Sequence, residues 1–222
     1  MSVLEILGKL DVIYPKGHYV HHNGRHGETY YNKFPGDAIC SSPLTTKCLC
    51  EGLVEHFADF HVEAVVAPLT DGGAILSHVI AYGLRVHGQG RDKEILSLYV
   101  ERDANGSVSL MHGYRSLVTG KRILVVADAI DKTDARTMAG FMDVRDVVNC
   151  VRQAGGRIVG VGTICNFGPV PTNIFVRIPL CSLVTIDTTT YAPEECPMCK
   201  EGVPINLEIG YGKVFSAAPQ KG

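Results

Sequence analysis

Short apolar runs alternate along the chain with segments in which apolar residues recur every three or four positions. A continuous apolar run of about four to eight residues is typical of a buried strand, whereas the wider spacing is typical of an amphipathic helix. The strands predicted in this way are 64–68, 95–100, 122–127, 157–165 and 181–186. The predicted helices are 3–13, 43–59, 74–86 and a segment that ends at the glycines 155 and 156. This alternation predicts an α/β fold with a central, mostly parallel sheet flanked by helices.

Two segments fall outside the alternation. Residues 17–33 are rich in His, Tyr and Gly, and they predict two short strands around a turn at Asn23-Gly24. We expect them to belong to a small N-terminal hood that covers about residues 1–40. Residues 191–222 are rich in Pro, Gly and Cys and predict a C-terminal tail. The predicted division is therefore an α/β domain over 1–190, which includes the hood, followed by the tail.

Length and charge restrict the possible classes of protein. A chain of 222 residues is long enough for one α/β domain with a sizeable core. The net charge of -2 gives no reason to expect a nucleic acid or a membrane as partner, and no apolar run approaches the roughly 18 residues of a membrane span. The N-terminus lacks the basic region of a signal peptide, so we expect a cytoplasmic protein whose 8 cysteines are reduced.

Asp128 follows the apolar run 122–127, at what should be the carboxyl end of a parallel strand. Ligands of open α/β sheets bind beyond those ends, so Asp128 is a candidate to contact a ligand hydroxyl or a metal. The alternative is a carboxylate that caps the following turn. Gly72-Gly73, after the strand 64–68, is either a tight turn or a place where the backbone approaches an anion.

The loop that follows Asp128 has an unusual charge pattern for an anion site. Asp131 and Asp134 alternate there with Lys132 and Arg136. At about 4 Å and an effective dielectric near 20, each pairing of a carboxylate with a phosphate charge costs roughly 4 kcal/mol. Lys132 and Arg136 would offset that repulsion if they turn toward the ligand.

Two groups of potential metal ligands stand far apart in the sequence. Cys196 and Cys199 have the spacing of half a zinc site, but no second pair with matching spacing follows. A structural turn is the favoured interpretation, with zinc, shared across a dimer, as the alternative. The histidines His18, His21, His22 and His26 are expected to be solvated or hydrogen-bonded, because no neighbouring Cys or carboxylate completes a set.

Four segments taken in order resemble the type I phosphoribosyltransferases, and among these the orotate phosphoribosyltransferases. Residues 17–33 resemble the N-terminal segment of that family, and 66–74 are similar to its pyrophosphate-binding loop. Residues 98–102 through 112–114 resemble its mobile hairpin, and 191–204 resemble a tail found in some prokaryotic members. The resemblance implies transfer of ribose 5-phosphate from phosphoribosyl pyrophosphate to orotate, assisted by Mg²⁺, in a homodimer.

The resemblance also implies roles for particular residues. Asp128 would hold the ribose hydroxyls and meet Mg²⁺ only through the diphosphate, while Lys33 would lie near the base and the pyrophosphate. Arg102 and His112 would close over the leaving group as catalytic residues. The remaining predicted substrate contacts come from the two loops, and they are Asp71, Gly72, Gly73, Lys132, Thr133 and Arg136.

The chain departs from the family pattern at the same loop. Ala127 replaces the first of two adjacent acids, and 131–135 replace a loop rich in Thr and Gly. Arg102 stands where the hairpin usually has a lysine. Two other functions therefore stay open at this stage: a non-catalytic nucleotide-binding or regulatory protein with the same fold, and a phosphoribosyltransferase for another base.

Overall fold

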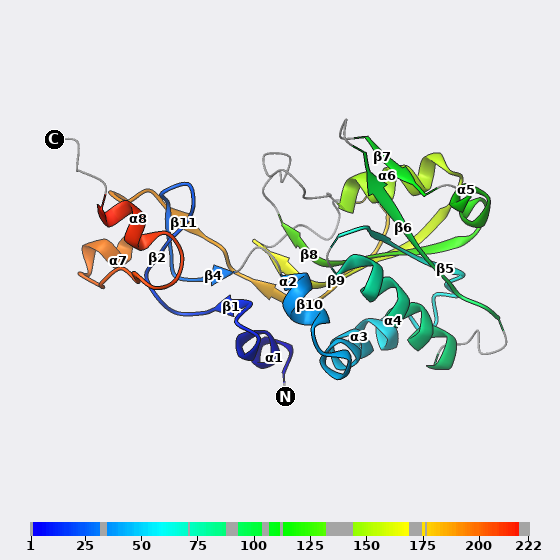
Figure 1. Cartoon of the computed structure of the whole chain (residues 1–222), viewed down its shortest axis with the longest axis horizontal. Helices are drawn as coiled ribbons and strands as arrows, with labels where there is room; N and C mark the ends of the chain where they lie inside the picture. The colour runs from blue at the N-terminus through cyan, green and yellow to red at the C-terminus, as the bar shows by residue number, and fades with distance from the viewer. Residues whose placement is uncertain are drawn as a thin grey trace. The chain divides into compact units, whose positions relative to one another are not determined.

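The computed structural model describes residues 2–31, 35–70, 72–87, 93–103, 107–111, 113–131, 144–168, 175 and 177–217. The chain forms two compact units (Figure 1). One unit is Phe34–Thr185, and the other combines Met1–Lys33 with Ile186–Gly222. This division differs from the predicted one, because the tail joins the N-terminal segment instead of following a domain that ends at 190.

A six-stranded sheet forms the centre of the larger unit. Its strands, in spatial order, are β10 (Leu180–Ile186), β9 (Arg157–Phe167), β8 (Arg122–Asp131), β5 (Ala64–Pro68), β6 (Leu96–Arg102) and β7 (Val108–Leu110). The pairs β5–β6, β5–β8 and β8–β9 are parallel, whereas β6 and β7 form an antiparallel hairpin. The predicted mostly parallel sheet is confirmed.

Helix α3 begins where the sequence supplies a cap. Ser42 accepts a hydrogen bond from the Thr45 amide, and Pro43 occupies the first turn of α3 (Pro43–Phe57). The other helices are α2 (Pro35–Cys40), α4 (Gly73–His87), α5 (Tyr114–Val118) and α6 (Val144–Gln153). The predicted helices 43–59 and 74–86 agree within two residues. Beyond β7, Gly113 adopts a φ of 88° and is the N-cap residue of α5.

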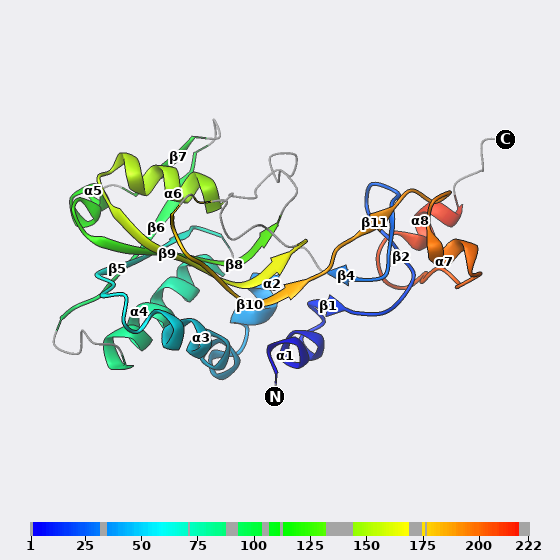
Figure 2. The ribbon, with the colours of Figure 1, turned by 180° about the vertical axis from the view of Figure 1, so that it is seen from behind.

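The sheet is covered on both faces (Figures 1 and 2), with α3 and α4 on one and α6 on the other. Phe57 of α3 packs over Gly160 of β9, where an added Cβ would lie 2.4 Å from the Phe57 ring. Four valines of α6 are buried against Ile123 and Val125 of β8. These contacts explain why the sequences of β5 and β8 are continuous apolar runs, since both of their faces are buried.

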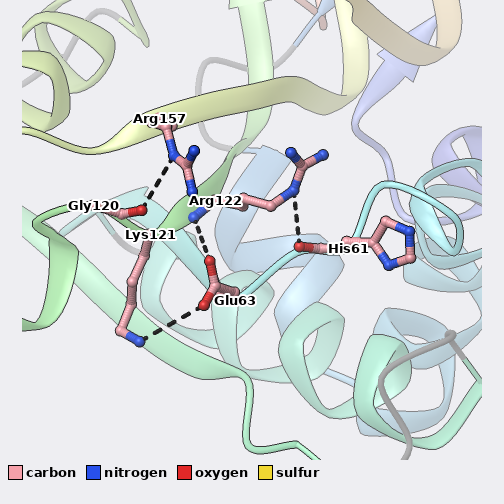
Figure 3. A network of polar contacts seen from close by, with 6 residues as sticks. All are labelled: His61, Glu63, Gly120, Lys121, Arg122 and Arg157. Carbon is pink, nitrogen blue, oxygen red and sulfur yellow. Dashed lines mark hydrogen bonds and ion pairs between the residues drawn. The ribbon is translucent and has the colours of Figure 1, made fainter.

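A polar network joins the amino ends of β5, β8 and β9 (Figure 3). The backbone N–H of Arg122 donates to Glu63 Oε2 at 2.9 Å, and the Arg122 guanidinium donates to the carbonyl of His61 at 3.2 Å and to that of Phe60 at 2.8 Å. Lys121 Nζ lies 3.9 Å from Glu63 Oε1, and Arg157 Nε donates to the Gly120 carbonyl at 3.2 Å. The network satisfies backbone groups that the sheet leaves unpaired at this edge.

The smaller unit is built from very short elements. Its first helix, α1 (Val3–Lys9), begins with a capping box of Ser2 and Glu5. The helix ends before residue 13, the predicted end, and Asp11, which follows it, has a φ of 55°. Strand β1 (Ile13–Tyr14) pairs with β4 (Tyr30–Tyr31). A second sheet has the order β11 (Thr190–Tyr191), β3 (His26–Gly27), β2 (Tyr19–Val20). The remaining helices are α7 (Pro197–Lys200) and α8 (Gly212–Ala217).

The predicted turn at Asn23-Gly24 is confirmed. Gly24 has a φ of 76°, and Asn23 Oδ1 accepts a hydrogen bond from the Arg25 amide at 3.1 Å. The predicted tail does not stand apart, because β11 pairs antiparallel with β3 and brings Tyr191 opposite His26. Across the described ranges of the chain, no helix has both the length and the apolar character needed to cross a membrane.

Replacing Arg122 by Met should lower the free energy of unfolding by about 1–2 kcal/mol, because the carbonyls of Phe60 and His61 lose a charged donor. Urea denaturation measures the effect. Arg85→Met, at an exposed position near the end of α4, is the matched control and should change little. Equal midpoints for the two variants would show that the network does not stabilise the fold.

Candidate active site

The order of strands places a topological switch point, the usual position of a ligand crevice, at the carboxyl ends of β5 and β8. From β5 the chain passes through α4 to β6 on one side, whereas from β8 it passes through α6 to β9 on the other. The two neighbouring strands therefore send their connections in opposite directions (Figure 1). Open α/β sheets bind ligands at such a switch point.

The turn between β5 and α4 forms one side of this crevice. Its amides are held by nearby carbonyls: Leu69 N–H donates to Val100 at 2.7 Å, and Gly73 N–H donates to Thr70 at 3.2 Å. A Cβ on Gly73 would lie 2.0 Å from the Pro68 carbonyl oxygen, so only glycine allows this approach of helix to strand. The turn directs the first amides of α4 to the carboxyl edge of the sheet, where an anion is favoured.

Asp128 lies on the other side of the crevice, but the predicted end of its strand was wrong. Strand β8 continues to Asp131 because β9 pairs with it as far as Asp131 and Phe167. The ladder with β5, in contrast, ends at Val66 and Val125. Asp128 therefore lies within β8 and beyond its paired region with β5, and its side chain is half-buried.

The surroundings of Asp128 are apolar on one side. Cys165, on the neighbouring strand β9, is fully buried. Burial raises the pKa of the Cys165 thiol, and the Asp128 carboxylate raises that pKa further. This thiol therefore stays protonated at neutral pH beside the carboxyl group of Asp128.

Arg102 ends strand β6 and forms an ion pair with the first turn of α6. Its Nη2 lies 2.9 Å from Asp146 Oδ2, and both side chains are about one-third exposed. An ion pair of this exposure contributes little to stability. Little free energy is therefore needed to break the ion pair and move Arg102 away from Asp146. The predicted role of Arg102 in closing over a leaving group stays a prediction.

The structure brings Gly72, Gly73 and Asp128 to the same edge of the sheet, since β5 and β8 are adjacent and parallel. Six other predicted site residues lie outside the described residues: Lys33, Asp71, His112, Lys132, Thr133 and Arg136. Their roles stay predictions.

The smaller unit contains a group of side chains that the sequence interpretation had kept apart. Cys196 and Cys199 lie with His18 and His26, and one ligand atom from each residue falls within 4.8 Å of the others. The expectation that no cysteine lies near the histidines was wrong. The signal in the sequence was present as two half-sites, but nothing in the sequence shows that residues so far apart meet.

Solved structures show the same fold. The orotate phosphoribosyltransferase of Mycobacterium tuberculosis matches with a TM-score of 0.58 at 19% identity, over 83% of this chain and 96% of that chain. The enzyme of the same name from Aeropyrum pernix matches with a TM-score of 0.56 at 17% identity, over 83% and 93%. A comparison with protein-family models found no match. The chain therefore has the fold of the type I phosphoribosyltransferases.

Relatives of known name narrow this class of protein to one family. The orotate phosphoribosyltransferase of Caldanaerobacter subterraneus subsp. tengcongensis is 34% identical over 204 residues, which are 92% of this chain and 94% of the relative. That of Thermotoga maritima is 30% identical over 209 residues, or 91% and 94%. The chain belongs to the orotate phosphoribosyltransferase family.

Replacing Gly73 by Ala should lower the free energy of unfolding by about 1–3 kcal/mol, because the added Cβ cannot fit beside the Pro68 carbonyl. The same change should weaken the binding of a diphosphate ligand, which calorimetry measures. Gly8→Ala is the matched control, since a Cβ there meets nothing within 4 Å and alanine favours the helix. Similar stability for both variants would contradict the tight turn.

Proposed function

We propose that this chain transfers ribose 5-phosphate from phosphoribosyl pyrophosphate to orotate, which gives orotidine 5'-phosphate and pyrophosphate in pyrimidine nucleotide synthesis. The observation that carries the proposal is the identity of 34% with an orotate phosphoribosyltransferase over 92% of the chain. The reactants would bind at the switch point, at the carboxyl ends of β5 and β8. The M. tuberculosis enzyme, which has the same fold, has been solved in complex with 5-phospho-α-D-ribosyl 1-diphosphate.

The chemistry of the transfer assigns a role to each side of the crevice. Positive charge develops on the ribose as the diphosphate leaves, and the leaving group takes negative charge. Asp128 is the anion on the sugar side, where it binds the ribose hydroxyls and favours positive charge nearby. Gly72 and Gly73 let the backbone and the first amides of α4 meet the diphosphate. Positioning and electrostatics do this work, since no covalent intermediate with the protein is needed.

Magnesium fits this arrangement as a partner of the substrate. In the ranges that the structure describes, the only group of three or more close potential ligands is the His and Cys group, so no carboxylate cluster surrounds Asp128 there. Mg²⁺ is commonly held by one or two carboxylates together with substrate phosphates and water. Asp128 would approach it through the ribose and diphosphate. When bound, Mg²⁺ neutralises charge on the leaving diphosphate.

A homodimer in the cytoplasm completes the proposal. Ile75, Tyr82 and Val86 of α4 are 44%, 67% and 41% exposed, and their spacing places them on one face of the helix. An exposed apolar stripe of this kind is typical of an interface between subunits.

The activity and the role of Asp128 are tested together. Calorimetry with phosphoribosyl pyrophosphate and Mg²⁺, followed by orotate and an assay for pyrophosphate, should show binding and turnover. Asp128→Asn should lower kcat/KM by at least about 100-fold, in the range seen when one electrostatic group is removed from a site. Thermal unfolding should stay close to that of the parent protein.

Two results would contradict this part of the proposal. Absence of binding at millimolar phosphoribosyl pyrophosphate would exclude the transferase. Binding without turnover with orotate would favour a non-catalytic protein or another base, and a panel of bases then separates these two. Glu55→Gln is the control, because Glu55 is exposed on α3 and its replacement should change kcat/KM by no more than about fivefold.

Tyr82→Lys should convert the dimer to a monomer, because a buried cation at the subunit interface would have no partner. Light scattering after gel filtration measures the mass. His87→Lys, at an exposed polar position at the end of the same helix, serves as the control. A mass that is unchanged in Tyr82→Lys would place the interface elsewhere.

A further inference from the structure

Four potential metal ligands converge in the smaller unit, from both ends of the chain. His18 directly precedes β2, and His26 lies in β3. Cys196 is the N-cap residue of α7, and Cys199 lies within that helix. The Sγ of Cys199 lies 3.6 Å from His18 Nε2 and 3.3 Å from His26 Nδ1. The Sγ of Cys196 lies 3.6 Å from the same His18 nitrogen. Each residue thus offers one soft or borderline donor atom to a common centre.

A hydrogen bond on the side of the ring away from the group fixes the orientation of His18. Its Nδ1 lies 2.7 Å from the backbone carbonyl of Val203. A carbonyl only accepts, so Nδ1 carries the proton and Nε2 presents its lone pair to the centre of the group. A backbone carbonyl in this position is the usual outer partner of a metal-binding histidine.

The separations agree with a tetrahedral ion. Zinc bonds of about 2.0 Å to nitrogen and 2.3 Å to sulfur place N and S ligands roughly 3.5 Å apart in a tetrahedron. The three N···S distances are 3.6, 3.6 and 3.3 Å. The two ring nitrogens, His18 Nε2 and His26 Nδ1, are 2.8 Å apart and need to separate by only about 0.5 Å.

Burial and charge favour the same occupant. His18, His26 and Cys196 are 2%, 6% and 0% exposed, whereas Cys199 is exposed and leaves a path for entry. Two thiolates balance a divalent cation, and two neutral imidazoles complete four ligands without an open position. A closed set of two sulfurs and two nitrogens suits zinc, while Mg²⁺ and Ca²⁺ require oxygen ligands.

We propose that His18, His26, Cys196 and Cys199 bind one structural zinc ion that joins the N-terminal hairpin to the C-terminal segment. The strands of this unit are each two residues long, so their hydrogen bonds hold it weakly. Small units of this kind commonly depend on a metal, because the energy of metal binding becomes energy of folding. The proposal does not depend on orotate as substrate.

The first experiment measures metal in the full chain, purified without chelator and without a histidine tag. Mass spectrometry of the metal should give about one zinc per chain. Cys199→Ser and His26→Gln should each lose most of it. Cys48→Ser and His22→Gln are the matched controls, since both residues are exposed and stand outside the group, and they should keep the full content.

A second measurement keeps the test valid if a variant fails to fold. Zinc is removed from the parent protein with a chelator and replaced by Co²⁺, whose visible absorption should show tetrahedral geometry with thiolate ligands. Zinc-free parent protein with no cobalt spectrum would overturn the proposal. So would a Cys199→Ser variant that keeps its zinc, or a disulfide between Cys196 and Cys199 in the protein as purified. These readouts are independent of transferase activity.

Discussion

The parallel pairing of β5 with β8 is the constraint on which the larger unit depends. Their ladder joins Ala64–Val66 to Ile123–Val125, and both strands are buried by helices on either face. Because the chain leaves the two strands in opposite directions, their shared carboxyl edge is the switch point of the sheet. The core that stabilises the sheet thus also determines where a ligand is expected, and the polar network at Arg122 joins the strands at the opposite edge.

Local sequence signals predicted this framework well. The apolar run at 64–68 and the helical spacing of apolar residues at 43–59 gave elements that agree with the structure within two residues, because these patterns of burial are local. The end of β8 was missed for a different reason. Asp128 and Asp131 are poor strand formers, and only the ladder with β9, which continues to Phe167, keeps them in the sheet.

The group of histidines and cysteines shows the limit of such signals. His18 and Cys199 are separated by 181 residues, so no periodicity or local motif links them. Their convergence follows from the pairing of β11 with β3, which is a long-range contact. The sequence showed the spacing of Cys196 and Cys199 as half of a metal site, and only the fold shows that His18 and His26 complete it.

The two units therefore solve the problem of stability by different means. Fixing the backbone of the four residues that β3 and β11 contribute to their ladder costs roughly 4–8 kcal/mol. The β11–β3 ladder has only two residue pairs, and net hydrogen bonds of about 1 kcal/mol each do not offset that cost. Structural zinc contributes about 10–16 kcal/mol in zinc-finger peptides, which exceeds it. The metal would then join the two ends of the chain within the smaller unit, where strands of two residues each provide few hydrogen bonds.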